Sequence, residues 1–173
     1  ELGHPVHAFD LDKLEGGEIN IRYAQTGETM LPLGADAKEI ELSAEDLVIA
    51  DAAKPIALAG VKGGAASSVD ENTTDLLLET ATFTPSAVRR SSRRHGIASD
   101  SSYRFERQVP DRQVPIASER LLQLILSVAG GEAAPPTMVG TIAPAPTMTL
   151  RFSRIKTVLG IEICLLYTSP SPR

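Results

Sequence analysis

Residues suited to chemistry are concentrated at three places in this sequence, and the first is residues 3–10, Gly-His-Pro-Val-His-Ala-Phe-Asp. His4 and His7 can titrate near neutral pH and orient a polar ligand, although a histidine on an apolar segment is more often a structural hydrogen-bonding group. Asp10 completes this polar cluster. No cysteine or second histidine pair follows at ligand spacing, so the sequence predicts no metal site. The segment predicts a shaped, partly polar site.

A glycine-rich segment, Gly60 to Ala65, follows the apolar run that begins at Pro55. It lacks the Gly-Lys-Ser/Thr ending of a phosphate-binding loop and the Gly-x-Gly-x-x-Gly spacing of a dinucleotide site. One interpretation is a tight turn. The other is a wall without side chains, against which a substrate can lie close to the backbone.

Glu79 is the third candidate, because it directly follows the apolar run at residues 76–78. A carboxylate at the end of a buried strand needs a compensating partner. That partner can be an arginine of the protein, which would make Glu79 structural, or a hydrogen-bond donor on a ligand. The local sequence favours neither alternative.

Positive charge is concentrated in one segment of an otherwise acidic chain, whose formal net charge is −5. Residues 89–107 hold Arg89, Arg90, Arg93, Arg94, Arg104 and Arg107 against Asp100 and Glu106. Such a segment is commonly a solvated helix face with arginine–acid pairs, and it also suits a local anionic partner. The single cysteine, Cys164, excludes a disulfide within the chain.

The elements that must position these residues are strands in the first half of the chain and helices in the second. Residues 18–24 alternate in polarity, which predicts a half-buried strand with Ile19, Ile21 and Tyr23 on its inner side. Apolar runs predict buried strands near residues 47–50, 55–61 and 76–78. With 42% hydrophobic and 23% charged residues the composition is that of a globular protein, and no run reaches the ~18–20 apolar residues of a membrane span.

Start and stop residues predict a helix between Thr84, as N-cap, and Gly96, with Pro85 in its first turn. The strongest helical periodicity runs from about residue 112 to 129 and ends at a glycine pair. Prolines at 135, 136, 144 and 146 predict a linker, and a short helical pattern at 153–159 follows it. Together these elements predict an α+β fold in which helices pack on mixed or antiparallel sheets.

Six blocks along the chain together resemble the B3/B4 domain of bacterial phenylalanyl-tRNA synthetase β subunits. In order they are Gly-His-Pro-Val-His-Ala-Phe-Asp, Asp-Leu-Val-Ile-Ala-Asp, Ala-Leu-Ala-Gly-Val-Lys-Gly-Gly, Leu-Leu-Leu-Glu, Arg-Arg-His-Gly and Tyr-Arg-Phe-Glu-Arg. The resemblance implies a B3/B4 editing domain at residues 1–132 that begins upstream, a proline-rich linker at 133–148 and the start of a B5 domain at 149–163. Residues 164–173 do not continue this pattern, and we interpret them as the translation of a sequencing adapter.

In that family the domain hydrolyses tyrosine wrongly attached to the phenylalanine tRNA. The resemblance implies that Glu79 accepts a hydrogen bond from the tyrosyl hydroxyl and that His7 orients substrate or water. It implies substrate-binding walls at Gly60, Gly63, Gly64, Ser99 and Ser101. The chain departs from the family at Lys62, where an apolar residue is common, and at Ser101, where several members have alanine.

The resemblance further implies a cytoplasmic ligase that binds tRNA(Phe) and pairs this β subunit with an α subunit, two copies of each, with no membrane contact. ATP and Mg²⁺ belong to the whole enzyme, and we expect no cofactor within this chain. Phosphate contacts to tRNA are assigned to Arg89, Arg90, Arg93 and Arg94. Because the family's domain begins upstream of Glu1, we expect the isolated chain to be inactive and marginally stable.

Two other functions fit the sequence. In one, the chain is a non-catalytic tRNA-binding or scaffold module, whose arginines contact phosphate while Glu79 belongs to a structural pair. In the other, it is a generic acidic α+β ligand-binding domain. Hydrolysis of Tyr-tRNA distinguishes the editing hypothesis from both.

Overall fold

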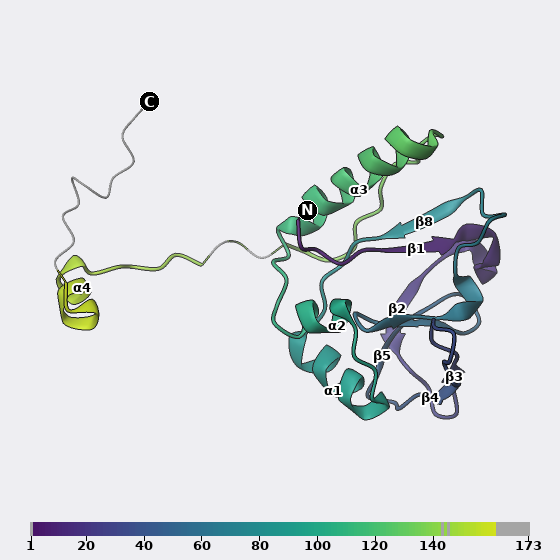
Figure 1. Ribbon diagram of the computed structural model, residues 1–173, viewed down its shortest axis with the longest axis horizontal. Helices are drawn as coiled ribbons and strands as arrows, with labels where there is room; N and C mark the ends of the chain where they lie inside the picture. Colours follow the sequence, from purple (N-terminus) through teal and green to yellow (C-terminus); the bar gives the residue numbers. More distant parts are fainter. Residues whose placement is uncertain (1, 143, 145, 162–173) are drawn as a thin grey trace. The chain divides into compact units, whose positions relative to one another are not determined.

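The computed structural model describes residues 2–142, 144 and 146–161, which divide into two compact units, Glu1–Ile142 and Ala143–Arg173 (Figure 1). The strands, all in the first unit, are β1 (His7–Asp10), β2 (Asn20–Tyr23), β3 (Thr29–Met30), β4 (Ile40–Glu41), β5 (Leu47–Ala50), β6 (Pro55–Leu58), β7 (Lys62–Gly63) and β8 (Leu76–Glu79). The helices are α1 (Pro85–His95), α2 (Asp100–Phe105), α3 (Gln113–Ala129) and, in the second unit, α4 (Phe152–Leu159), with short 3₁₀ turns at Leu11–Lys13, Glu15–Gly17 and Ala65–Ser67. Residues 162–173, which include the adapter-like tail, lie outside the described residues.

Every strand pairing in the described part of the chain is antiparallel. Four strands form one sheet in the order β2-β5-β6-β7, while β1 pairs with β8 and β3 pairs with β4. Helices α1 and α2 lie together on one side of these strands (Figure 1). This arrangement confirms the predicted α+β class and makes its sheets antiparallel.

The core lies on both faces of the two central strands. Val48 and Leu58 are buried in one cluster of apolar side chains, whereas Ile49 and Ala57 are buried in a second one. Successive strand residues point to opposite faces, so a strand covered on both sides must be apolar at every position. This explains why β5 and β6 could be predicted from uninterrupted apolar runs. Phe83 packs against both clusters.

The predicted inner side is right for Ile19, which precedes β2 and packs against the second core cluster, and wrong for the two other residues. Ile21 and Tyr23 are 53% and 61% exposed. The partly buried side chain of this strand is Arg22, whose guanidinium donates two hydrogen bonds to the Glu28 carboxylate, at 2.8 and 2.6 Å. An arginine whose guanidinium is hydrogen-bonded can pack its aliphatic part against the protein, so Arg22 occupies the inner position of β2.

Helix α1 begins and ends where the sequence predicts. Gly96 adopts the left-handed conformation (φ 64°), and its N–H donates to carbonyls of the last turn. The Thr84 side chain makes no capping hydrogen bond, so its predicted side-chain role is wrong although the boundary is right. Ala87, Val88 and Ser91 form the buried face of the helix.

Helix α2 was not predicted from the sequence, whereas α3 lies where its periodicity predicts. Ser99 caps α2: its hydroxyl accepts from the Ser102 N–H at 3.0 Å, and the Ser102 hydroxyl in turn accepts from the Ser99 N–H at 3.0 Å. In α3 the only fully buried residue is Ala117. Apolar side chains at Ile116 and Val128 remain exposed on this helix.

Candidate functional site

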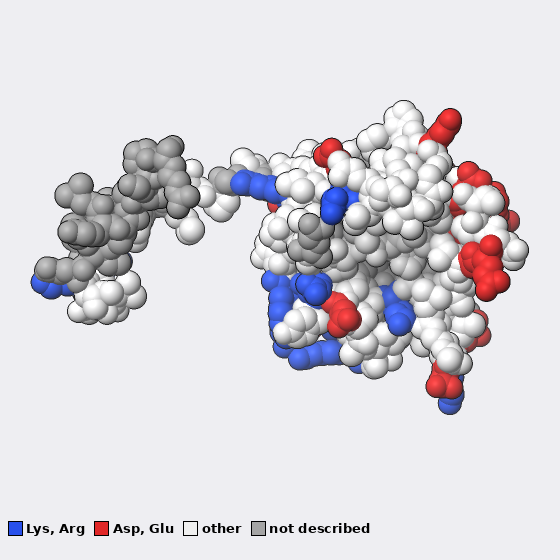
Figure 2. Space-filling view, turned by 45° about the horizontal axis from the view of Figure 1, so that its top comes forward, with Lys and Arg blue, Asp and Glu red and all other residues white. Residues whose placement is uncertain are grey.

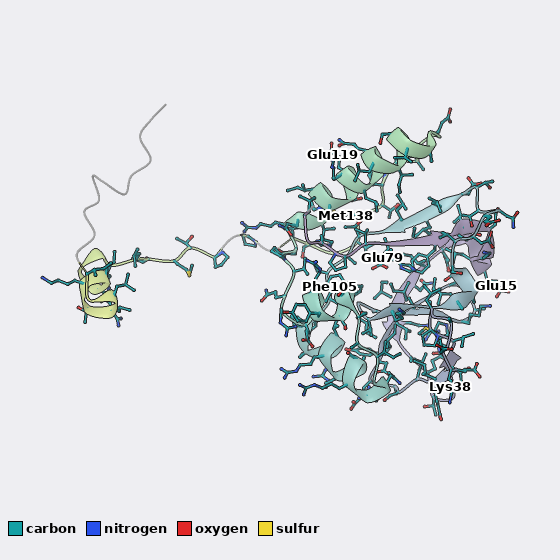
Figure 3. All side chains as sticks on the ribbon, viewed as in Figure 1. Glu15, Lys38, Glu79, Phe105, Glu119 and Met138 are labelled. Carbon is teal, nitrogen blue, oxygen red and sulfur yellow. The ribbon has the colours of Figure 1, made fainter. Side chains whose placement is uncertain are left out.

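Strands β1 and β8 bring together the two ionisable residues that the sequence singles out. His7 lies directly opposite Glu79 in the antiparallel register. Opposed residues of such a pair project from the same face with Cβ atoms about 4.5–5.5 Å apart. Figure 3 shows Glu79 on the end of β8 that points toward α2, where Phe105 is labelled. The two strands therefore present an imidazole and a carboxyl group side by side.

Gly63 makes room for the His7 ring. A Cβ atom at position 63 would lie against the His7 ring, 2.7 Å from Nε2, and 3.1 Å from Leu33 Cδ1. The first distance is shorter than real Cβ contacts, so a side chain here would displace the imidazole. The glycine thus serves the close approach of the His7 ring, and its role as a wall for a substrate stays a prediction.

Gly60 forms a second bare position. Its φ is +69°, and a Cβ atom there would lie 2.9 Å from both Phe83 and Val88. Two serines fix the backbone beside it, since Ser101 Oγ donates to the Gly60 carbonyl at 3.1 Å and Ser99 Oγ donates to the Val61 carbonyl at 2.6 Å. The serine hydroxyls therefore hold the glycine segment against the start of α2.

These residues surround one cavity of about 320 Å³. Its polar lining includes His7, Glu79, Ser99 and Ser101, and both Gly60 and Gly63 contribute backbone. Its apolar lining is Pro5, Val6, Leu33, Ile49, Ala57, Leu58, Val61, Phe83 and Phe105, with Lys62 and Asp100 completing it. An apolar hollow with a few convergent polar groups is the usual form of a small-ligand site.

Gly64 is the one predicted wall residue that does not line this cavity. A Cβ atom at this position would lie 2.6 Å from the Ile56 carbonyl oxygen, so the glycine serves close backbone packing. Its N–H donates to that same carbonyl at 2.7 Å, and the Ala65 N–H donates to Leu31 at 2.8 Å. Neither amide is free to bind a substrate.

Glu79 has an environment that favours its protonated form. Burial raises the pKa of the Glu79 carboxyl to about 7, because removal from water disfavours the charged state. Among the described residues no donor or cation pairs with its side chain, so the structural-pair alternative is not what the structure has. Glu79 is a carboxyl group that titrates near neutral pH and faces a cavity.

His7 is held neutral by the same cavity wall. Burial lowers the pKa of its imidazole, and its ring lies edge-on to Phe9 with centroids 4.5 Å apart. Its Nε2 atom is buried and has no hydrogen-bond partner among the described residues. A buried, unpartnered ring nitrogen can accept or donate one hydrogen bond to a molecule in the cavity, depending on its tautomer.

A larger hollow of about 620 Å³ lies beside β3, β6 and the 3₁₀ turn at 65–67. Its glutamates already have partners: Glu28 pairs with Arg22, and Glu39 accepts from the Thr29 hydroxyl at 2.8 Å. Among the described residues, the unpartnered groups whose pKa burial shifts and that line one of the two hollows are His7 and Glu79, both in the smaller cavity. We therefore place the candidate site there.

Comparison with known protein families gives the fold and this site a context. The family model described as B3/4 domain matches residues 1–130. This chain belongs to the B3/4 domain family. The match covers all of β1 to β8, all of α1 to α3, and every residue of the cavity lining. The resemblance stated from the six sequence blocks is thereby confirmed.

The relatives of this B3/4 domain are β subunits of phenylalanine–tRNA ligases. The one from Thiobacillus denitrificans is 44% identical over 164 residues, which is 94% of this chain and 21% of the relative. The subunits from Chlorobium luteolum and Yersinia pestis are 47% and 43% identical, over 94% of this chain and 20% of each relative. The chain therefore spans about a fifth of the length of these relatives.

The arginines that the sequence groups together are separated by the structure of this B3/4 domain. Arg89, Arg90 and Arg93 are exposed on α1 and form no ion pair among the described residues. Arg94 instead pairs with Glu45 and with the buried Asp46, so its assignment to phosphate is the weakest of the four and stays a prediction. Figure 2 shows basic side chains gathered along one side of the first unit, with acidic ones mostly toward the other.

Asp10, which the sequence singles out, and His95 both have structural partners. Asp10 accepts from the Thr73 hydroxyl at 2.7 Å and pairs with Lys13 at 3.1 Å. The hydrogen bond from Thr73 contributes most to holding the pKa of Asp10 below its ordinary value. His95 Nε2 lies 2.6 Å from Asp46 Oδ2. Neither Asp10 nor His95 lines the cavity.

The aromatic part of the site was not predicted from the sequence, although Phe105 lies in the last of the six quoted blocks. Phe83 and Phe105 both line the cavity and meet edge-on with centroids 5.1 Å apart. They were missed because α2 was missed and because Phe83 precedes α1 by two residues, outside any motif. The capping pattern from Ser99 to Ser102 is the signal that could have revealed α2.

Neither a metal site nor a membrane span emerges from the described residues of this domain. They contain no group of three or more His, Cys, Asp or Glu side chains able to hold an ion. None of their helices is both long enough and apolar enough to cross a bilayer.

Proposed function

We propose that this chain is the editing module of a phenylalanine–tRNA ligase β subunit and that its cavity hydrolyses the ester bond of Tyr-tRNA(Phe). The observation that carries the proposal is the unpartnered Glu79 carboxyl at the end of an aromatic-walled cavity. A tyrosyl side chain combines an apolar ring with one hydroxyl, which is the ligand that such a cavity suits. The similarity to the β subunits of phenylalanine–tRNA ligases supplies the chemical context.

The polar groups divide the work between recognition and positioning. Ionised Glu79 accepts a hydrogen bond from the tyrosyl O–H, and Phe83 and Phe105 contact the ring. A site that hydrogen-bonds a substrate hydroxyl strongly disfavours the analogue without it, because its buried polar group is then left unpaired. Phenylalanine esters are therefore bound poorly by the same cavity and remain intact.

The reaction is the addition of one water molecule to an ester. The water oxygen bonds to the tyrosyl carbonyl carbon, the ester C–O bond breaks, and a proton reaches the ribose oxygen that leaves. The products are free tyrosine and a tRNA with its terminal hydroxyl restored. His7, neutral and with a buried ring nitrogen unpartnered, orients the substrate or the water. No general base is assigned.

The proposal is tested in a chimeric subunit, in which this chain replaces the matching segment of the Thiobacillus denitrificans β subunit, assembled with the α subunit of that organism. We expect it to deacylate Tyr-tRNA(Phe) faster than Phe-tRNA(Phe), measured by release of labelled amino acid. The control is the same subunit with the segment deleted. Tyr-tRNA(Phe) loss no faster than in that control would exclude an editing function.

The remaining roles follow from membership of such a ligase and belong to the same proposal. The whole enzyme would attach phenylalanine to tRNA(Phe) in the cytoplasm with ATP and Mg²⁺, and this subunit would pair with an α subunit. No described residue of this chain is assigned to ATP or Mg²⁺.

A second candidate, a non-catalytic tRNA-binding role, is favoured by the outer face of α1. Arg89 and Arg93 lie one turn apart on the side of α1 away from its buried face, and like charges at that spacing repel. An RNA phosphate backbone would relieve this repulsion, and arginine suits phosphate because its guanidinium can donate two parallel hydrogen bonds.

The arginine surface predicts a salt-dependent loss of binding. The double variant Arg89→Ala/Arg93→Ala is expected to reduce the slope of log K against log salt for tRNA binding by about 1.4 to 1.8, since each phosphate contact contributes about 0.7 to 0.9. Fluorescence titration of the chimeric subunit at several salt concentrations measures the slope. Lys38→Ala/Lys54→Ala removes the same charge from two other exposed residues and should leave it unchanged. Equal slopes for both double variants would rule out this surface.

A further inference from the structure

The ladder between β1 and β8 ends next to the candidate site. Its last pair is His7 with Glu79, and continuing the same register would place Pro5 opposite Ala81. Any interaction that holds the two strands together beyond this pair also fixes the backbone of Glu79.

The hydrogen-bonding pattern of the ladder shows which group is missing there. The Leu11 N–H donates to the Asp75 carbonyl at 2.9 Å, just past the other end of the strands. In an antiparallel ladder every second pair is a hydrogen-bonded pair, and counting in twos from Leu11 reaches residue 5. A ladder donor is therefore needed at Pro5, which has no N–H. The Ala81 carbonyl loses its backbone partner for this reason.

His4 supplies the missing donor. Its Nε2 lies 3.0 Å from the Ala81 carbonyl oxygen. A carbonyl only accepts, so Nε2 carries the hydrogen and Nδ1 has the lone pair. Nδ1 is buried without a partner among the described residues, and burial, the larger influence, lowers the pKa of this imidazole. The ring is thus held neutral, in the tautomer that the Ala81 carbonyl requires.

The same ring contacts the aromatic wall of the cavity. The His4 and Phe105 rings meet edge-on, with centroids 6.1 Å apart and planes at 90°. Phe105 meets Phe83 in the same manner, at 5.1 Å. His4 itself does not line the cavity. It therefore joins the strand pair that carries His7 and Glu79 to the side chains that form the opposite lining.

We propose that His4 is a positioning residue of the candidate site, whose imidazole replaces the N–H that Pro5 lacks and thereby fixes the Glu79 backbone against β1. This inference rests on the proposed editing function and adds a determinant of its specificity. Only a carboxyl held in place can distinguish a hydroxyl from a hydrogen on the substrate ring. We call the hydrogen bond from His4 to the Ala81 carbonyl the clasp. Its loss is expected to lower discrimination between tyrosine and phenylalanine rather than hydrolysis in general.

The test is a double-mutant cycle in the chimeric subunit. His4→Phe keeps the ring on Phe105 but removes the donor, and Pro5→Ala restores the backbone N–H of the ladder. His4→Phe alone is expected to lower the Tyr-to-Phe ratio of kcat/KM for deacylation about twofold to tenfold, as for one lost neutral hydrogen bond. In the Pro5→Ala background the same substitution should leave the ratio unchanged. His4→Gln, which keeps a donor, should retain most of the discrimination.

Several results would overturn the inference. They are an equal fall of kcat/KM for both substrates, an equal fall of the ratio in both backgrounds, and no fall at all. If His4→Phe does not fold but the double variant folds and discriminates, the inference is upheld, whereas failure of both to fold refutes it. If the unmodified chimera does not deacylate Tyr-tRNA(Phe), the proposed function fails by itself. The role of His4 is then tested by urea unfolding of the four proteins of the cycle. His4→Phe should lower the unfolding free energy when residue 5 is proline and should leave it unchanged when residue 5 is alanine.

Discussion

Glu79→Gln is expected to lower the Tyr-to-Phe ratio of deacylation by about 10- to 150-fold, because a hydrogen bond to a charged group contributes about 1.5–3 kcal/mol. The amide has nearly the shape of the carboxyl group but never becomes an anionic acceptor. The ratio should be measured in the chimeric subunit at about pH 8, where a carboxyl with a pKa of about 7 is mostly ionised. In the unmodified subunit the ratio should rise as the pH passes through 7.

Glu119→Gln is the matched control, since it makes the same chemical change on the exposed surface of α3 (Figure 3). It should leave the ratio unaltered at every pH. A Glu79→Gln subunit that still prefers Tyr-tRNA(Phe) as strongly as the unmodified one would show that another group reads the hydroxyl.

The same substitution should stabilise the empty protein at alkaline pH. The pKa of Glu79 rises from 4.5 to about 7 on folding, so between these values the folded state retains a proton that the unfolded state has released. Stability therefore falls as the pH rises through this window, by about 3 kcal/mol in total, and is level above it. The difference in unfolding free energy between the unmodified chain and Glu79→Gln, measured with urea, should show this fall, because it cancels the opposite contributions of His4 and His7, whose pKa values burial lowers. Parallel curves for the two proteins would refute the raised pKa.

Asp46→Ala is expected to cost about 3–5 kcal/mol of unfolding free energy, as when one member of a buried ion pair is removed. Asp46 is fully buried and accepts hydrogen bonds from the Ser43 N–H, the Ser91 hydroxyl, Arg94 and His95. Burial alone would raise the pKa of Asp46, but the hydrogen bonds from Ser91, His95 and Ser43 outweigh burial and hold it below the ordinary value. Without the carboxylate, the inner face of α1 keeps donors that have no acceptor.

Glu45→Ala provides a close comparison, because Glu45 pairs with the same arginine but its side chain is 71% exposed. An exposed pair contributes only about 0–1 kcal/mol, so this variant should unfold at nearly the same urea concentration as the unmodified chain. Similar losses for both variants would contradict the structural role of Asp46. Because α1 also carries the exposed arginines, Asp46→Ala should weaken tRNA binding as well.

Local sequence patterns correctly predicted strands that are buried on both faces and a helix with clear start and stop residues. Strands β5 and β6 are covered on both faces, and α1 has a proline at its start and a glycine after its end, so short-range rules sufficed. For β2 the alternation correctly grouped Ile21 with Tyr23, but alternation does not say which face meets the core. The pairing of Arg22 with Glu28 decided that, and it involves a loop residue outside the strand.

The candidate site was predictable only in part. His7, Gly60, Gly63 and Glu79 could be proposed together because the order of motifs resembles a known domain. The different environment of Arg94 could not be predicted, because it depends on the carboxylate of Asp46, which precedes β5 and meets α1 only in the folded protein. The clasp by His4 likewise becomes apparent only once the register of β1 on β8 is known.

Two residues that line the cavity, Gly60 and Gly63, have no side chain. The His7 ring at Gly63, and Phe83 and Val88 at Gly60, occupy the places that a side chain would need, so a methyl group at either position would displace one of these residues. Every glycine codon is one base change away from an alanine codon. A single base change could therefore displace the His7 ring while the histidine and the glutamate are both kept. A survey that scores only His7 and Glu79 would overlook such a change, so the residues at positions 60 and 63 should be compared as well.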